Sequence, residues 1–371
     1  MRAAPAPSVL PVLPVLPVLP ALLALLALLV PPAARAALAG PGTQVAPEEL
    51  VEARRWAAAK LEGAAGPPFS FLYDGRPFAE LQGGWEVKSD SRRNGQGPTD
   101  HTVSWTDPRT GLVVRLAALE HHDFPALEWT LHIKNAGAAD TPIVSEVQAL
   151  DLKIERATEG ETILHHTTGD LCTPESYAPH ALRLAPGPGC DHRFAPTGGR
   201  PTNGAFPYFN LERPGGGTII ALGWPGQWAA RFTCDGGTGL RVRAGQELTR
   251  FVLHPGEEVR TPLVVLLFWR GDHVRAQNLW RRWMLEHNAP RDRDRRPPPP
   301  ILSSCSGGFF PGLKTNETDE LRFIDAFARE GVKLDYWWMD AGWYPCGEGW
   351  PKVGTWTPQA TTRNTARRRR R

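Results

Sequence analysis

Cysteine is scarce in this chain of 371 residues, and its spacing matches no metal-binding motif. The odd number excludes complete pairing within one chain. If the protein is exported, a Cys172–Cys190 disulfide is one expectation, and buried free thiols are the alternative. The 11 histidines show no HExxH or comparable ligand spacing, so no metal site is expected. The five cysteines are Cys172, Cys190, Cys234, Cys305 and Cys346.

A large charge of one sign is also missing. Lysine and arginine number 42 and aspartate and glutamate 39, which gives a net charge of +3. Several of the arginines lie in the two terminal segments, at Arg2, Arg35, Arg363 and 367–371, so the remaining body has more acidic than basic side chains. This balance argues against a protein that binds nucleic acid.

Long hydrophobic runs are missing beyond the first 36 residues. Those residues have a positive charge near their start at Arg2, continue with an apolar run from Val9 to Val30 that prolines interrupt, and end in Ala34-Arg35-Ala36. A positive start, an apolar run and a small-x-small end are typical of a cleavable signal peptide, here residues 1–36. The sequence therefore predicts a secreted or periplasmic protein with no stable membrane span. A membrane anchor is the alternative.

Glycine and proline are abundant, at 37 each, and 14 tryptophans contrast with 5 tyrosines. After a helix predicted for 47–60, short alternating or β-branched runs separated by turn residues recur as far as residue 269. This pattern predicts a large antiparallel β-sandwich over residues 47–270. The strands expected include 102–105, 112–119, 126–134, 143–154, 218–222, 240–243 and 263–268.

The pattern changes after the sandwich. A helix at 272–287 and a charged, proline-rich stretch form a predicted linker over 271–300. Beyond it come a strand, a Gly-rich loop at 307–314, a helix that Asn316 can cap, and a second strand. This order predicts a βαβ unit with parallel strands at 301–304 and 334–339 and a helix at 317–330. Residues 359–371 form an Arg-rich tail with no hydrophobic period.

The most informative string is LDYWWMDAGWYP, residues 334–345. Asp340 stands at the carboxyl end of the second predicted parallel strand, where β/α barrels place functional groups. A carboxylate accepts hydrogen bonds from two sugar hydroxyls, and an indole covers an apolar sugar face. Asp340 with Trp337, Trp338 or Trp343 therefore indicates a sugar-binding site. The alternative is an aspartate that caps local backbone among packed aromatic rings.

Four strings together resemble glycoside hydrolase family 36, the melibiase-like α-galactosidases. One is the string around Asp340, and the others are GAFPYFNL (204–211), IALGWPGQWAARF (220–232) and NLWRRWMLEHNAPR (278–291). The resemblance covers approximately residues 69–358. It implies a multi-domain fold in which a large N-terminal antiparallel β-sandwich (supersandwich) precedes the start of a (β/α)8 TIM barrel, here an incomplete catalytic domain at 301–358.

The resemblance also implies a function and its site residues. The family hydrolyses terminal α-galactosides with retention and without a metal or organic cofactor, so an α-galactoside oligosaccharide is the expected partner. A homo-oligomer is compatible with the sequence. Asp340 would bind galactose hydroxyls, with Trp338 and Trp343 beside it. Trp224 and Trp228 would wall the pocket from a sandwich loop, although core packing is an equal alternative for Trp228.

Two departures from the family pattern, Ala341 and Pro225, concern the recognition of galactose hydroxyls. The family's nucleophile and acid/base lie on later barrel strands, and neither motif occurs here. A barrel needs about 250 residues, far more than follow Pro300. The expectation is therefore an inactive fragment, truncated or frame-shifted near Pro358. Alternatives are a related activity, such as α-N-acetylgalactosaminidase or galactosyl transfer, and a non-catalytic carbohydrate-binding β-sandwich.

Overall fold

The computed structural model describes residues 43–62, 66–185, 189–294, 296–305, 317–346, 350–354 and 356. The expected signal peptide, the Gly-rich loop at 307–314, the Asn316 cap and the tail at 359–371 lie outside these residues. The chain divides into two compact units, one ending at Asn288 and the other beginning at Ala289. In the described residues, every helix is too short or too polar to cross a membrane.

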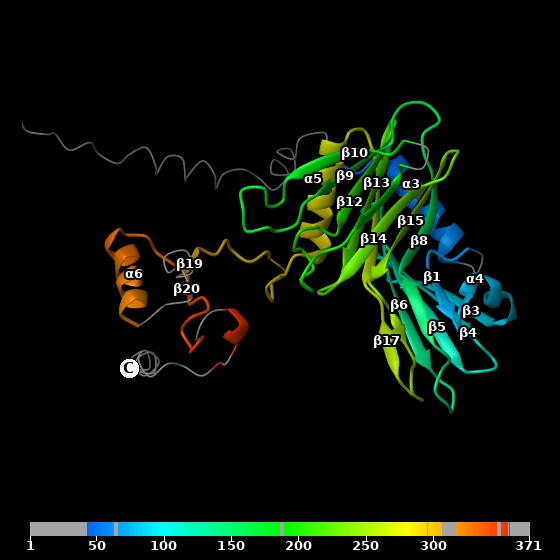
Figure 1. Ribbon diagram of the computed structural model, residues 1–371. Helices are drawn as coiled ribbons and strands as arrows, with labels where there is room; N and C mark the ends of the chain where they lie inside the picture. The colour runs from blue at the N-terminus through cyan, green and yellow to red at the C-terminus, as the bar shows by residue number, and fades with distance from the viewer. Residues whose placement is uncertain are drawn as a thin grey trace, which may run out of the picture. The chain divides into compact units, whose positions relative to one another are not determined.

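The first unit consists mostly of antiparallel strands with a few helices (Figure 1). Its helices are α3 (Pro47–Lys60), α4 (Phe78–Leu81), the 3-10 turn η2 (Gln82–Gly84), α5 (His273–Trp283) and the π-helical turn η3 (Met284–Asn288). Its first strands are β1 (Ser70–Tyr73), β2 (Arg76–Pro77), β3 (Glu86–Arg93), β4 (Thr99–Thr106), β5 (Leu112–Glu120), β6 (Ala126–Asn135), β7 (Val144–Gln148), β8 (Leu150–Glu155) and β9 (Ile163–Thr167). The others are β10 (Pro179–Arg183), β11 (Asp191–Phe194), β12 (Tyr208–Arg213), β13 (Gly216–Gly223), β14 (Trp228–Cys234), β15 (Gly239–Gln246), β16 (Arg250–Phe251), β17 (Glu258–Arg260) and β18 (Leu263–Arg270).

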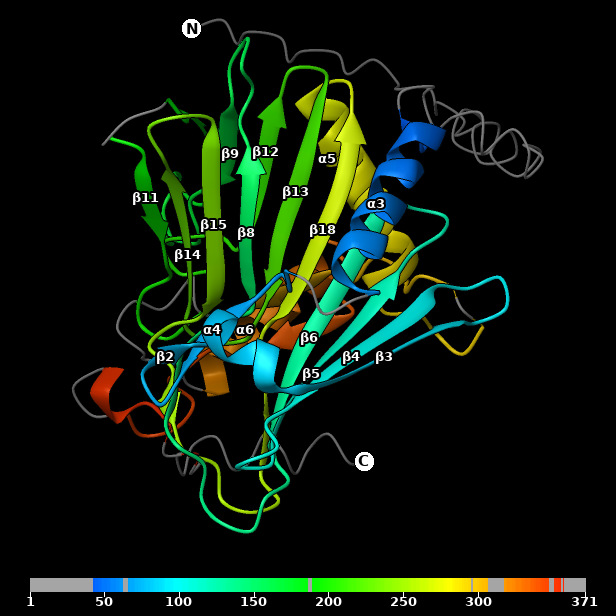
Figure 2. The same ribbon diagram turned by 90° about the vertical axis from the view of Figure 1, so that its right-hand side faces the viewer.

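These strands form one large sheet and two small ones. The large sheet has the order β10-β9-β12-β13-β18-β6-β5-β4-β3, with β17 also paired to β6. The small sheets have the orders β11-β14-β15-β8 and β16-β7-β1-β2. Figure 2 shows β15 and β8 in front of the large sheet, which is the layered arrangement of a sandwich.

Both faces of the large sheet are buried near β18. Successive side chains of a strand point to opposite faces, and on β18 Leu266 and Phe268 enter the core that the sheets share. Val265 and Leu267 enter a second core on the opposite face, which α5 covers with Leu279 and other apolar side chains. Burial on both faces explains why this strand reads as an unbroken apolar run rather than an alternating one.

The helix predicted for 47–60 is confirmed as α3, and the other expected strands are present. One prediction needs correction, because the run 143–154 is two strands. Its first half, β7, pairs with β1 and β16, whereas its second half, β8, pairs with β15 in the other small sheet. The chain changes sheets between them, and Glu146 has a left-handed φ of 50°.

The helix predicted for 272–287 is α5 followed by η3. Asp272 precedes α5 and caps it, since its Oδ1 accepts a hydrogen bond from the Arg275 N–H at 2.8 Å. The side chains of Ala276, Leu279 and Trp283 form the buried stripe of the helix. The spacing of these three residues, at three and four positions, fits one helical face.

The second unit contains β19 (Ser303–Cys305), α6 (Glu317–Arg329), β20 (Tyr336–Trp338) and the 3-10 turn η4 (Trp350–Lys352). β19 and β20 are paired in parallel, with Ser304 opposite Trp337. A parallel pair joined through α6 confirms the predicted βαβ unit, although both strands are short. The start of a TIM barrel remains a prediction.

The expected Cys172–Cys190 disulfide is wrong. Cys190 is bonded to Cys234 instead, with 5.3 Å between the Cα atoms, and Cys172 is an exposed free thiol. The pairing follows from strand register, because β11 and β14 are antiparallel with Asp191 opposite Thr233. That register places Cys190 directly across from Cys234, whose N–H donates to the Cys190 carbonyl at 2.9 Å.

Candidate functional site

Asp340 lies in a turn just beyond β20. Its Oδ1 accepts a hydrogen bond from the N–H of Ala341 at 2.8 Å. Gly342 is buried with a φ of +118°, a conformation that glycine adopts without the strain a side chain would bring. The sequence predicts a carboxylate after the strand and a backbone turn at Gly342, and the structure has both. One carboxylate oxygen is bonded to local backbone, so the sugar-binding role of Asp340 remains a prediction.

The two faces of β20 have different surroundings. Trp337 faces α6, where its Nε1 donates to the buried carboxylate of Glu320 and its ring lies 6.1 Å from the ring of Phe327. Tyr336 and Trp338 point to the other face and are 63% and 68% exposed. Of the tryptophans on this strand, Trp337 therefore packs against the helix, and Trp338 offers an open indole.

Trp343 belongs to a group of aromatic side chains after the turn. Its ring meets the Tyr344 ring edge-on at 4.6 Å and lies 5.9 Å from the ring of Trp356. Tyr344 is buried, whereas Trp356 is 71% exposed. Trp356 was not predicted as a site residue, because it stands 13 positions after Trp343 in a segment without periodicity. Trp343 and Trp356 together form an aromatic surface in the second unit.

Trp224 and Trp228 lie in the first unit. Trp228 begins β14 and is completely buried, with its Nε1 donating to the Pro201 carbonyl at 2.7 Å. Core packing, the alternative given from the sequence, is thus what this unit shows for Trp228. Trp224 precedes β14 in the loop, is half-buried, and has the Arg260 guanidinium 5.7 Å from its ring centroid. A role for either indole in galactoside binding stays a prediction.

A cavity of about 440 Å³ lies between α5 and the β9–β10–β12 end of the large sheet. No local sequence pattern indicates this cavity, because its lining comes from segments that are distant in the sequence. Aromatic and imidazole rings form most of its wall. The lining includes His165, His166, His180, Phe206, Tyr208, Asn210, His273 and Trp280.

Burial favours the neutral forms of two groups that line this cavity. Burial lowers the pKa of His166 and raises the pKa of Tyr208. Asn210 accepts a hydrogen bond on Oδ1 from the Trp269 Nε1 at 2.8 Å, while its buried Nδ2 has no partner among the described residues. The cavity therefore combines aromatic walls with an uncommitted amide donor, a combination suited to a polar organic ligand.

Two groups of histidines and carboxylates have donor atoms within 4.8 Å of one another in the described part of the chain. One comprises His165, Glu212 and His273, and the other His121, Asp123 and His287. In the first, a single oxygen, Glu212 Oε2, lies 2.6 Å from His165 Nε2 and 3.8 Å from His273 Nδ1. Sequence spacing missed both groups because each joins residues that precede residue 213 to a histidine in α5 or η3.

No family model and no curated protein matches this sequence. Solved structures do match its fold. The GH36 α-galactosidase AgaB from Geobacillus stearothermophilus aligns with a TM-score of 0.58 and 14% identity over 81% of this chain and 42% of that enzyme. AgaA from the same organism aligns with a TM-score of 0.55 and 16% identity over 77% of this chain and 40% of that enzyme. The α-galactosidase from Lactobacillus brevis aligns with a TM-score of 0.55 and 14% identity over 76% of this chain and 40% of that enzyme.

The chain thus spans about two fifths of the length of these enzymes. Variants of AgaA have been solved in complex with raffinose, stachyose and 1-deoxygalactonojirimycin. At such identities the similarity is one of fold. Four sequence strings and the three-dimensional comparison thus agree, since the described fold is similar to the corresponding region of the GH36 α-galactosidases.

Proposed function

We propose that this chain comprises the sandwich domain and the first two barrel strands of a GH36-type α-galactosidase that acts on terminal α-galactosides. The observation that carries the proposal is the parallel β19–α6–β20 unit that follows the sandwich and has Asp340 just past its second strand. Functional groups of β/α barrels stand at this end of the strands. The fold similarity to α-galactosidases supports the same reading.

The exposure pattern of the second unit supports a barrel beginning. In a β/α barrel, helices cover the outer face of the strands and the inner face meets side chains of the other strands. Here α6 covers the face of β20 that holds Trp337, while Tyr336 and Trp338 on the opposite face are open. In a closed barrel, Tyr336 and Trp338 would point inward, and Trp338, the residue nearer the carboxyl end, would lie close to the mouth.

Binding and catalysis are separate parts of this proposal. A retaining glycosidase needs two carboxyl groups about 5 Å apart, a nucleophile and an acid/base. The family resemblance places both on later barrel strands and gives Asp340 a binding role only. For the 371-residue chain we therefore propose galactoside recognition without turnover.

The Cys190–Cys234 disulfide supports a secreted or periplasmic location. Structural disulfides persist in oxidising compartments and are rare in the cytosol. The signal-like residues 1–36 point the same way. Mass analysis of the protein recovered from the medium or periplasm would test both features. It would detect the Cys190–Cys234 bond, and it would show whether a new amino terminus follows residues 1–36.

Two assays with the full chain test the proposed function. The first incubates pure protein with an aryl α-galactoside, and we expect no product. The second titrates 1-deoxygalactonojirimycin and raffinose and compares Asp340→Asn with Asp325→Asn, which removes an exposed carboxylate from α6. Asp340→Asn removes the charge and one acceptor oxygen, so the loss of one charged hydrogen bond, worth about 1.5–3 kcal/mol, should weaken binding at least tenfold in this variant only. Equal binding by both variants would remove Asp340 from the site.

The cavity beside α5 favours a second candidate, a carbohydrate-binding sandwich. Trp280 and Tyr208 meet edge-on at 5.3 Å in its wall, and the Asn210 amide donor has no partner within the described ranges. Galactoside binding that survives Asp340→Asn but is lost in Trp280→Ala would support this candidate. Loss in Asp340→Asn alone would support the barrel site.

A further inference from the structure

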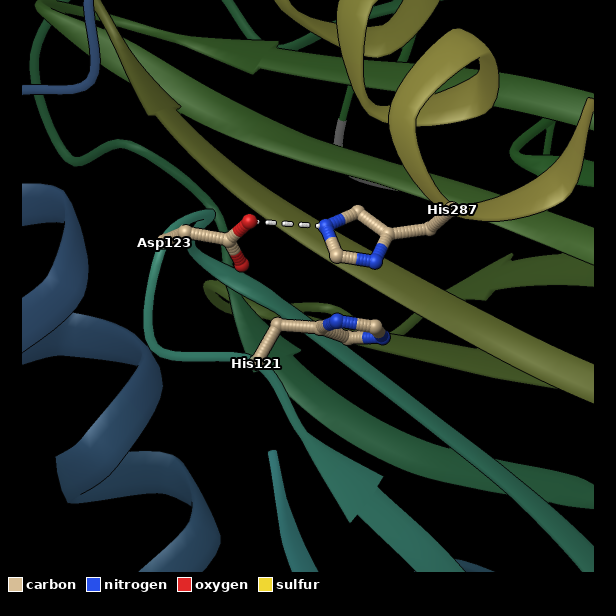
Figure 3. Close-up of side chains that lie close together, drawn as sticks. All are labelled: His121, Asp123 and His287. Atoms are coloured by element: carbon tan, nitrogen blue, oxygen red, sulfur yellow. Dashed lines mark hydrogen bonds and ion pairs between the residues drawn. The ribbon is translucent and has the colours of Figure 1, made fainter. Parts of the chain in front are cut away.

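His121, Asp123 and His287 lie close together and come from the loop after β5 and from η3 (Figure 3). His121 directly follows β5, Asp123 stands two residues later, and His287 comes from η3, 164 residues beyond Asp123. His287 Nε2 lies 2.9 Å from Asp123 Oδ2. Two ligand atoms of a tetrahedral ion, each 2.0–2.1 Å from it, are about 3.3–3.4 Å apart. The existing pair is therefore within about half an ångström of the separation of two neighbouring zinc ligands, and a small widening of this exposed pair admits an ion.

The third residue is oriented by a carboxylate behind it. His121 is buried, and its Nε2 lies 3.1 Å from Glu128 Oε1. With a proton on Nε2, the lone pair of the ring is on Nδ1. Within the described residues this buried Nδ1 has no hydrogen-bond partner, so it is the nitrogen of His121 that is available to an ion.

This arrangement is the one that metal-binding histidines commonly have. A ligating imidazole usually donates its other ring N–H to a carboxylate, which fixes the tautomer and the direction of the lone pair. A buried acceptor with no partner is unfavourable, and coordination to an ion would remove that defect. The other histidine group differs, because there one oxygen of Glu212 already forms an ion pair with each imidazole.

Aromatic neighbours hold the two imidazoles in place. The Trp283 ring packs edge-on against His121 at 5.8 Å, and the Phe124 ring packs edge-on against His287 at 5.5 Å. Asp123 and His287 reach solvent, with 60% and 26% of their side chains exposed. An ion can therefore enter from solvent, and water can fill the coordination positions that the protein leaves open.

We propose that His121, Asp123 and His287 bind one divalent transition-metal ion of the zinc class. Two imidazoles and a carboxylate are a common ligand set for Zn²⁺, with water completing the shell. The ion takes the place of the proton that His287 Nε2 shares with Asp123. That proton moves to Nδ1 of His287 or to solvent. Once bound, the ion ties η3 to the loop between β5 and β6.

The test uses the full chain, purified without a polyhistidine tag and treated with a chelator. ZnCl2 is titrated calorimetrically, and Co²⁺ absorption reports the ligand field. We expect one site per chain that His287→Gln and Asp123→Asn each weaken by at least tenfold. Glu128→Gln, which alters only the orienting carboxylate, should weaken Zn²⁺ binding by about 10- to 100-fold.

Two matched variants control for other histidines. His254 Nδ1 lies 2.8 Å from Asp140 Oδ1 in an exposed pair outside both three-residue groups, so His254→Gln should leave Zn²⁺ affinity unchanged. His165→Gln should do the same. The proposal is overturned if Zn²⁺ does not bind, if the double variant of Asp123 and His287 binds normally, or if His165→Gln abolishes the site.

Discussion

Arg275 on α5 binds Glu49 on α3 through both ends of its guanidinium group, with Nη1–Oε1 at 2.6 Å and Nη2–Oε2 at 3.2 Å. The Glu49 side chain has no exposed surface. It also accepts hydrogen bonds from the N–H groups of Arg270 and Ala46, at 2.7 and 2.8 Å. One carboxylate thus joins the first helix of the sandwich to the last, across 226 residues of sequence.

Arg275→Met should therefore destabilise the first unit strongly. The substitution leaves the buried Glu49 carboxylate without its cation, and breaking such a pair typically costs about 3–5 kcal/mol. Urea unfolding followed by tryptophan fluorescence measures the loss. Arg183→Met is the matched control, because Arg183 and Glu161 form an exposed pair at 3.1 Å and should contribute little. Equal stability of the two variants would mean that the buried pair does not hold the helices.

The disulfide gives a second prediction. Cys190 and Cys234 are 44 positions apart, and closing a loop of that length stabilises a fold by about 2–4 kcal/mol. The Cys190→Ala, Cys234→Ala double variant should lose that amount, whereas Cys172→Ser should unfold like the parent protein. Peptide mapping without reduction should recover a Cys190–Cys234 pair. A linked Cys172–Cys190 peptide would contradict the structure.

Acid should destabilise the first unit in two steps. Burial lowers the pKa of His166 below its ordinary 6.5, so the unfolded chain binds the proton more readily and stability falls as the pH drops below about 6.5. The hydrogen bond from His101 lowers the pKa of Glu120 below 4.5, which adds a second loss as the pH falls through and below that value. His166→Gln should flatten the melting-temperature profile between pH 7 and 5.

His254 provides the opposite sign for comparison. The hydrogen bond to Asp140 raises the pKa of His254, so its contribution is present below pH 6.5 and is lost as the pH rises through the folded-state value. His254→Gln should therefore lower stability slightly at acid pH and leave it unchanged at alkaline pH. The His166→Gln prediction has its own counter-result. If the melting temperature of that variant depends on pH as it does in the parent protein, other groups cause the acid sensitivity.

The sequence predicted the local elements well and the long-range pairings poorly. Helix α3 and strands such as β5 and β6 follow from capping, periodicity and turn residues, which act over a few positions. The Cys190–Cys234 bond and the division of 143–154 into two strands depend on register between distant strands. No local pattern contains that information.

The candidate sites divide in the same way. Asp340 and Gly342 could be selected from one short string, because a strand end and a turn are local features. The burial of Trp228 and the meeting of His121 with His287 could not, since each depends on which side chains the completed sandwich brings together. A lone histidine has no neighbours in the sequence that reveal its eventual partners.

The last prediction separates the two adjacent tryptophans of β20. Trp338 is 68% exposed, so Trp338→Ala should change stability by less than about 0.5 kcal/mol. If Trp338 covers a sugar face, losing about 50 Å² of apolar contact costs about 1 kcal/mol and weakens raffinose binding about fivefold.

Trp337→Ala should have the reverse effect. It removes the hydrogen bond to Glu320 and the packing on Phe327, which hold β20 against α6. Limited proteolysis should then cut faster within 317–338, while the first unit stays resistant because its cores lie entirely before residue 288. Measuring proteolysis and raffinose affinity on both variants distinguishes a binding surface from a packing surface. If Trp338→Ala accelerates cleavage and Trp337→Ala does not, then Trp338 packs against α6 and Trp337 is the exposed side chain, which contradicts the structure.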